Sequence, residues 1–173
     1  MNFLIFIAPN GFKDETLSKV RAFFDKWGIR YKVSSYSTKE CRGYHGAVVD
    51  PDINTNKVNT ADFDGIILLD GPGIDQYRLQ EFRPLLDLIL RFNTNGKYVA
   101  AVGNSLRILA RSNTIKGKKV SVPNDDEIKR LVLLFHGIPS EEGIEGADNV
   151  ISIGDSGALE EKLVRMMSHI GVN

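Results

Sequence analysis

The chain has 173 residues, of which 42% are hydrophobic and 25% charged, and its 22 basic and 22 acidic side chains cancel to a formal net charge of zero. This length predicts a single domain over residues 1–173, large enough to bury a core without disulfides or metals. A neutral chain lacks the basic surface that nucleic-acid binding requires, so we expect no nucleic-acid partner. The single cysteine allows no internal disulfide, which favours a reducing, cytoplasmic compartment. The apolar runs are shorter than the roughly 20 residues of a membrane span, so we expect no membrane partner.

Continuous apolar runs alternate with helical patterns along the chain. A strand that is buried on both faces is apolar without alternation, as in a parallel sheet covered by helices. The expected core strands are Phe3–Ala8, Arg30–Tyr36, Gly65–Leu69 and Tyr98–Val102, with Asn149–Ile153 near an edge. A shorter strand or hairpin arm is expected over Tyr44–Asp50.

Apolar residues at helical spacing predict the intervening helices. We expect Asp14 to cap the first of them, whose apolar face runs from Leu17 to Trp27 and which ends at Gly28. The other helical patterns cover Phe82–Ile89, Asn104–Ala110, Ile128–Phe135 and Leu159–Ile170. Three loops then follow core strands, at Asn10-Gly11, Asp70–Gly73 and Gly103–Ser105. Ligands of such sheets bind at the carboxyl ends of the strands, so these loops are the expected site.

The order of these loops resembles the superfamily of PfpI-type intracellular proteases, the parkinsonism-associated protein deglycase and the class I glutamine amidotransferases. The stretches that carry the resemblance are Ala8–Asp14, Gly43–Asp50, Phe63–Gly71, Gly96–Ser105 and Ile115–Val120. The likeness covers nearly the whole chain and is weakest between about residues 123 and 149. It implies a flavodoxin-like three-layer α/β sandwich with a mainly parallel central sheet. Related proteins commonly form dimers, so it also implies a homodimer.

The chain departs from this family at three catalytic positions. Active members carry a cysteine at the strand-to-helix elbow, where this chain has Gly103 followed by Asn104. Gly11 stands where they place a glutamate, and Pro72, which has no N–H, stands where their turn supplies an oxyanion donor. Loss of a nucleophile alone can lower a rate by on the order of a millionfold. We therefore expect no catalytic residues at the family site.

Two functional hypotheses follow from these departures. The first is a catalytically degenerate, non-enzymatic protein that binds a small metabolite or acts as a dimeric regulator. The alternative is a cysteine-independent hydrolase, deglycase or protease-like enzyme of the same superfamily, with a relocated nucleophile.

Other candidate sites are weaker. Ser105 lies two residues into the expected helix, with Arg107 where a nucleophile elbow needs its second glycine, so a structural role in the first turn is favoured. Gly71–Gly73 lacks the third glycine of a dinucleotide fingerprint. Cys41 and His45 alone provide too few ligands for a metal, and Cys41 is not expected to be a nucleophile. We expect no cofactor and no metal.

The remnant site is expected to bind a small polar metabolite. Its candidate residues are Asn10, Gly11, Asp70, Gly71, Gly103, Asn104 and Ser105. The helix that starts near Asn104 presents free N–H groups, whereas Asp70 opposes an anion and favours a neutral or zwitterionic ligand. Because Gly11 and Gly103 lack the family's side chains, we expect an enlarged crevice. An empty, solvated dent is the alternative.

Overall fold

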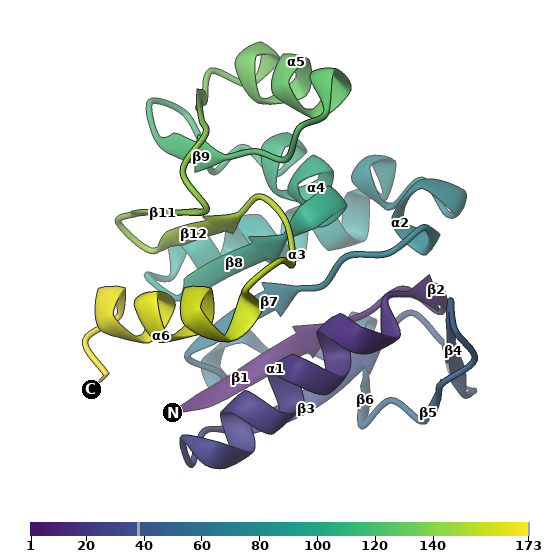
Figure 1. The fold of residues 1–173 in the computed structure, drawn as a ribbon. Helices are drawn as coiled ribbons and strands as arrows, with labels where there is room; N and C mark the ends of the chain where they lie inside the picture. The colour runs from purple at the N-terminus through teal and green to yellow at the C-terminus, as the bar shows by residue number, and fades with distance from the viewer. Residues whose placement is uncertain (38, 173) are drawn as a thin grey trace.

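The computed structural model describes residues 1–37 and 39–172. Its central sheet has seven strands in the order β11-β12-β8-β7-β1-β3-β6 (Figure 1). Neighbouring strands pair parallel, except that β11 is antiparallel to β12. These strands are β1 (Asn2–Phe6), β3 (Arg30–Ser35), β6 (Ile53–Asn54), β7 (Gly65–Leu68), β8 (Tyr98–Val102), β11 (Ile144–Ala147) and β12 (Val150–Ile153).

Two small sheets and six α-helices complete the fold. One small sheet contains β2 (Asn10–Phe12), β4 (Cys41–Gly43) and β5 (Val48–Val49), and the other contains β9 (Lys119–Ser121) and β10 (Ile138–Ser140). The α-helices are α1 (Asp14–Lys26), α2 (Gly73–Gln76), α3 (Arg83–Thr94), α4 (Leu106–Arg111), α5 (Asp126–Leu134) and α6 (Leu159–His169). Short 3-10 helices cover Thr55–Lys57, Thr60–Asp62, Leu79–Glu81 and Gly103–Ser105.

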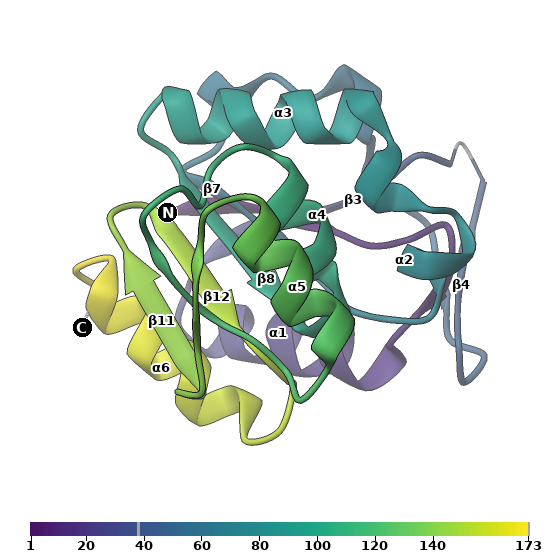
Figure 2. The same cartoon turned by 90° about the horizontal axis from the view of Figure 1, so that it is seen from above.

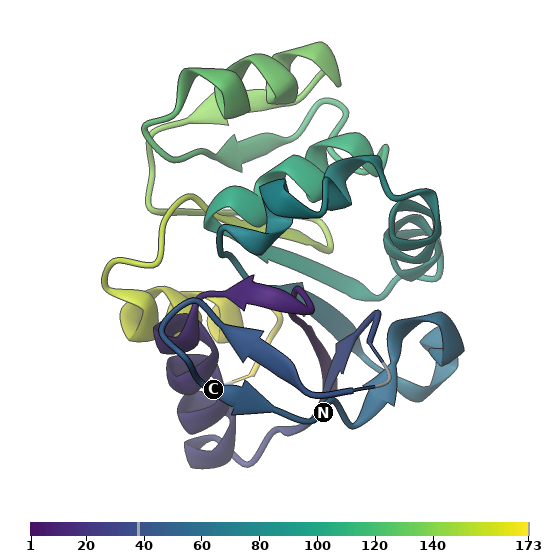
Figure 3. The same ribbon diagram turned by 90° about the vertical axis from the view of Figure 1, so that its right-hand side faces the viewer.

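The helices form two layers around the central sheet (Figures 1 and 2). Phe3 and Ile5 of β1 point into the core shared with α1 and α6, whereas Leu4 and Phe6 point into the core shared with α3 and α4. Burial on both faces explains why these strands are apolar without alternation. Helix α5, with β9 and β10, lies at the end of the molecule opposite the β4–β5 hairpin (Figure 3).

The expected flavodoxin-like three-layer fold is therefore confirmed. Tyr98–Val102 forms β8 with the predicted bounds, and the other four core strands differ by no more than two residues at either end. Asn149–Ile153 was expected near an edge, and β12 is the second strand from it because β11 pairs outside. Among the described residues, no helix combines the length and apolar character that crossing a bilayer requires.

One local prediction is wrong, and two others differ from the structure only at their first residues. Asp14 is the first residue of α1 and does not cap it, because its carboxylate instead accepts the N–H groups of His45 (3.0 Å) and Ala47 (2.8 Å). Those two residues belong to the turn between β4 and β5, so Tyr44–Asp50 begins with a turn and not with a strand. The helix expected from Asn104 starts as a 3-10 turn, and α4 itself begins at Leu106.

Candidate functional site

The three expected loops meet at the carboxyl edge of the central sheet. The backbone N–H of Lys13, at the end of the first loop, donates to the Asp70 carbonyl at 2.9 Å. The turn after β7 is joined in the same way to the elbow after β8, through Asn104 and Gly71. The fold thus brings together segments that lie about 30 to 90 residues apart in the sequence.

At the elbow, Asp70 occupies the space beside Gly103. A Cβ placed on Gly103 would lie 2.8 Å from Oδ2 of Asp70 and 2.9 Å from its Cβ. Gly103 also has a φ of +58°, which glycine adopts without the steric cost that side chains bring. The elbow therefore presents a neighbouring carboxylate where a nucleophilic side chain would stand.

The side chain of Asn104 is fully engaged by the turn after β7. Its Oδ1 accepts the Gly71 N–H at 2.9 Å, and its Nδ2 donates to the Gly71 carbonyl at 2.8 Å. A ligand that used the Asn104 amide or the Gly71 N–H would have to break this pair. The structure therefore gives these two residues a role in closing the site.

The crevice is not enlarged at its two glycines, contrary to expectation. A Cβ on Gly11 would lie 2.9 Å from the backbone N of Gly73, so α2 fills that space, as Asp70 does beside Gly103. Interiors are close-packed, and neighbouring groups fill the space beside both glycines. Asn10 stays exposed at the rim.

Ser105 lies beneath the site and is fully buried. Its Oγ is 2.9 Å from the Leu68 carbonyl and 2.7 Å from the Val102 carbonyl, and it accepts the Val102 N–H at 3.0 Å. It thus joins the ends of β7 and β8, whereas the sequence predicted bonds to the N–H groups of the helix. We leave Ser105 out of the proposed ligand contacts.

Asp70 provides the carboxyl group of the site. Its side chain is 10% exposed, and the Lys13 ammonium lies 3.9 Å from its Oδ2. Burial raises the pKa of this carboxyl above its usual value, although the nearby Thr16 hydroxyl and Lys13 charge partly oppose the shift. Within the described part of the chain, Oδ1 has no hydrogen-bond partner.

A cavity of about 200 Å³ lies next to Asp70, between the start of α1 and the loop before α6. Its lining residues are Lys13, Glu15, Thr16, Lys19, Ser156 and Gly157. Lys13 Nζ donates to Ser156 Oγ at 2.5 Å, which joins the two walls. Sequence reasoning missed Ser156, although the run Gly154–Gly157 after the last strand is a loop signal of the same kind as those it used.

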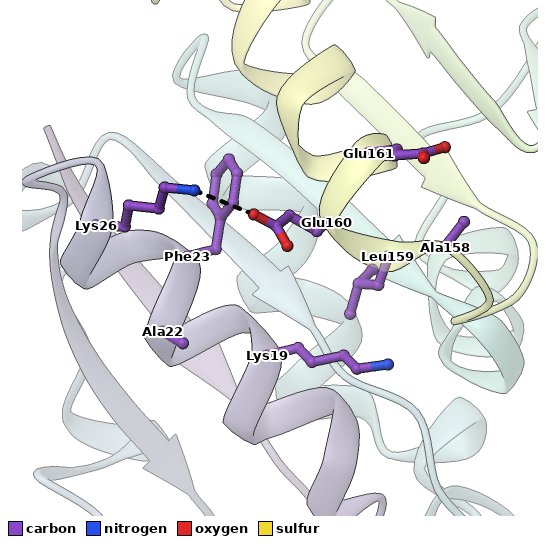
Figure 4. Close-up of a pocket in the computed structure, with 8 residues that line it drawn as sticks. All are labelled: Lys19, Ala22, Phe23, Lys26, Ala158, Leu159, Glu160 and Glu161. Carbon is purple, nitrogen blue, oxygen red and sulfur yellow. Dashed lines mark hydrogen bonds and ion pairs between the residues drawn. The ribbon is translucent and has the colours of Figure 1, made fainter.

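A larger groove of about 370 Å³ runs alongside, between α1 and α6 (Figure 4). Lys19 and Lys26 extend from α1, and Glu160 and Glu161 belong to α6. The Lys26–Glu160 ion pair, at 3.4 Å, crosses it. This groove lies mainly between the two helices, and it shares Lys19 with the cavity beside Asp70.

Cys41 lies next to the first loop, because β4 pairs with β2 in that loop. Its thiol is nevertheless buried in the core shared with α1 and α6, and burial raises its pKa. Both effects disfavour the reactive thiolate. The described residues contain no group of three or more His, Cys, Asp or Glu side chains placed to hold a metal ion.

The fold and the elbow define a class of protein: flavodoxin-like α/β sandwiches with a strand-to-helix elbow at the carboxyl edge of a central strand. The model of the DJ-1/PfpI family matches residues 1–127. The chain therefore belongs to the DJ-1/PfpI family.

Relatives in sequence and structure agree with this assignment. An uncharacterised protein of Methanocaldococcus jannaschii is 33% identical over 149 residues, which cover 86% of this chain and 72% of that protein. The deglycase PfpI of Pyrococcus furiosus is 27% identical over 116 residues, 67% of this chain and 69% of that enzyme. The crystal structure of a ThiJ/PfpI domain protein from Brachyspira murdochii has the same fold, with a TM-score of 0.90 at 21% identity, covering 98% of this chain and 95% of that one.

Proposed function

We propose that this chain is a catalytically degenerate member of the DJ-1/PfpI family, which binds a small polar metabolite at the carboxyl edge of its sheet. The observation that carries the proposal is the elbow, where the Asp70 carboxylate fills the space beside Gly103. A cysteine-dependent reaction needs a thiolate at this point, and the chain's one thiol is buried in β4.

Two further features of the turn after β7, an N–H that is already bonded and a proline, support the loss of the family's chemistry. An oxyanion hole needs free N–H donors aimed at the developing charge. The Gly71 N–H is already bonded to Asn104, and Pro72 has none. Replacing Gly103 by cysteine alone would therefore leave the reaction without its electrostatic support.

The test is a deglycase and peptidase assay of the purified protein, because one relative is named a deglycase. We expect no turnover above the buffer rate, and the same result for Cys41→Ser. Activity that Cys41→Ser abolishes would contradict the proposal. A thermal-shift screen of carboxylates, phosphates and amino acids tests binding, since a ligand at a hundred times its Kd adds about 2.7 kcal/mol of stability.

The alternative is an enzyme that uses Asp70 in place of a cysteine. It is favoured by the burial of this carboxyl, its raised pKa and its position at the elbow, which are features of a general base. Asp70→Asn distinguishes the two hypotheses, because any activity that depends on this base is lost in the variant while the fold is kept.

We further propose, from the family resemblance, that the protein is a cytoplasmic homodimer without a nucleic-acid or membrane partner. Its neutral net charge and its single, buried cysteine are consistent with this assignment. Light scattering coupled to size-exclusion chromatography tests the dimer, for which we expect twice the 19.2 kDa mass of one chain.

A further inference from the structure

We propose that the cavity between the start of α1 and the loop before α6 binds a small oxyanion, either a carboxylate or a phosphate group. This inference rests on the proposed function, because it names the ligand chemistry of the same edge of the sheet. It moves the ligand from the closed elbow to the neighbouring cavity of about 200 Å³.

The hydroxyl of Ser156 supplies the first argument. The Lys13 ammonium has only donors, so Ser156 Oγ accepts from it and keeps its own proton free. Within residues 1–37 and 39–172, no acceptor is recorded for that proton. The contact therefore leaves a donor on the cavity wall.

Thr16 supplies a second and independent argument. Its residue is only 1% exposed and lines the cavity, and its Oγ1 has no recorded hydrogen bond among the described residues, although it lies near the Asp70 carboxyl and lowers the pKa of that group. A buried polar group without a full hydrogen bond is costly, so an added acceptor would be favoured there. The Ser156 hydroxyl and the Lys13 ammonium present donors to the same cavity, which suits a ligand that brings oxygen acceptors.

The first turn of α1 adds further donors. The helix has 13 residues, and in the described structure no side chain caps it. The N–H groups of Glu15 and Thr16 therefore have no intrahelical acceptor, and the helix dipole favours negative charge beside them. The carboxylates of Asp14 and Glu15 also lie in this first turn, but Asp14 accepts hydrogen bonds from the β4–β5 turn and Glu15 is paired with Lys19.

The carboxylates around the cavity each have a lysine partner. Glu15 pairs with Lys19 at 2.8 Å, Asp70 with Lys13 at 3.9 Å, and Asp155 with Lys162 at 3.3 Å. The lysines thus offset the negative charge of these carboxylates locally. The remaining donors, the Ser156 hydroxyl and the N–H groups at the start of α1, then favour a ligand with oxygen acceptors. The Glu15–Lys19 pair is largely exposed and so contributes little. Lys19 reaches from α1 toward the loop before α6, as Figure 4 shows.

The test is an NMR titration of the ¹⁵N-labelled protein with sodium phosphate and, separately, with sodium acetate, at constant ionic strength set by sodium chloride. We expect saturable shifts of the Glu15, Thr16 and Gly157 amides. Tighter phosphate binding assigns the site to phosphorylated ligands, and tighter acetate binding assigns it to carboxylates. A Kd in the tens of millimolar is typical of a weak site with a single contact, so the titration extends to about 50 mM. If neither anion gives saturable shifts up to that concentration, the inference is overturned.

Variants locate the site. Lys13→Gln should weaken anion binding about tenfold and Ser156→Ala about fivefold, because charge-assisted hydrogen bonds are stronger than neutral ones. Lys13→Arg keeps the charge, so its Kd for the anion should stay within about threefold of the wild-type value. Lys26→Gln is the matched control, since Lys26 belongs to the same helix but lines only the groove, and it should change binding less than twofold. Equal losses in Ser156→Ala and Lys26→Gln overturn the proposal even if Lys13→Gln fails to fold.

The same data separate this inference from the proposed function. If the shifts centre on Gly71 and Gly103, the cavity is not the site, although binding at the carboxyl edge stands. If the protein proves to be a deglycase, the proposed function is wrong, whereas the anion titration still reports on the cavity.

Discussion

The side-chain amide of Asn104 is hydrogen-bonded to both backbone groups of Gly71, at 2.9 and 2.8 Å. One residue of the elbow thereby fixes the turn that follows the neighbouring strand. A Cβ on Gly71 would overlap the Gly11 carbonyl, so the first loop is packed against the same turn. The elbow and the first loop therefore hold the turn after β7 from two sides.

We predict that Asn104→Ala lowers the free energy of unfolding by about 1–3 kcal/mol, because it leaves the Gly71 N–H without a partner and removes one of the two hydrogen bonds to the Gly71 carbonyl, which keeps the Ile74 N–H at 3.1 Å. Urea denaturation measures the change. Asn56→Ala is the control: Asn56 is exposed, and its side chain takes part in no recorded hydrogen bond within the described residues. It should change stability by less than about 0.5 kcal/mol. Equal effects of the two substitutions would show that the Asn104–Gly71 pair contributes nothing.

Gly103→Ala should destabilise the protein more than Gly117→Ala does. Both glycines have positive φ, +58° and +73°, so both substitutions incur the backbone cost of about 1–2 kcal/mol. Only Gly103 has Asp70 within reach of a new Cβ, since nothing lies within 4 Å at Gly117. We expect an additional loss of about 1–3 kcal/mol at Gly103, the usual cost of overpacking, by urea denaturation.

Asp70→Ala tests whether the Asp70 carboxylate causes the difference in stability between Gly103→Ala and Gly117→Ala. In the background of Asp70→Ala, the additional cost of Gly103→Ala should shrink without disappearing, because Oδ2 and Cγ are removed while the Cβ of residue 70 stays 2.9 Å from the new Cβ. An additional cost of unchanged size in this background would place the strain elsewhere. The double variant Gly103→Cys/Asp70→Ala should still show no deglycase activity, since Pro72 and the bonded Gly71 provide no oxyanion donor.

Thr16→Val should stabilise the free protein by about 1 kcal/mol, because it replaces a buried hydroxyl that has no recorded partner by a methyl group of similar shape. The same substitution should weaken oxyanion binding if the cavity is the ligand site. Ser112→Ala is the control of opposite sign, since its buried hydroxyl is bonded to the Leu109 carbonyl at 2.6 Å and its loss should destabilise. Thermal unfolding with and without phosphate measures both effects. A destabilised Thr16→Val would mean that this hydroxyl is satisfied in solution.

Asp70 should make the protein less stable as the pH rises above about 3.9, the usual pKa of an aspartate in an unfolded chain. Burial raises the folded-state pKa of this carboxyl, so the native state holds its proton more tightly than the unfolded state does. The penalty is absent below the unfolded pKa, grows between the two pKa values, and is constant above the folded one.

The measurement compares wild type with Asp70→Asn by urea denaturation from pH 3.5 to 7.5. The stability of wild type relative to the variant should fall across the lower part of this range and then level off. Other carboxyls with lowered pKa, such as Asp14 and Asp155, are present in both proteins and cancel in the difference. A difference that rises with pH would show that the Lys13 charge, rather than burial, dominates at Asp70.

Local composition by itself determined the sheet and the position of its edge loops. A strand covered on both faces must be apolar at every position, so runs such as Tyr98–Val102 were recognisable without knowledge of their partners. Turn residues directly after these runs located the three loops. The hairpin arm predicted for Tyr44–Asp50 exists as β5 but begins later than expected, because β4 and β5 are two or three residues long and follow no alternation.

Only the tertiary structure decided what the site contains. Asp70 lies beside Gly103, Asn104 bonds Gly71, and Lys13 reaches Ser156 across 143 positions of sequence. None of these contacts is encoded in local periodicity, because each depends on how strand ends from different parts of the chain are brought to one edge. The sequence determined that a glycine follows β8 at the elbow, but close packing decided that the Asp70 carboxylate fills the space beside it and that the cavity opens beside α1.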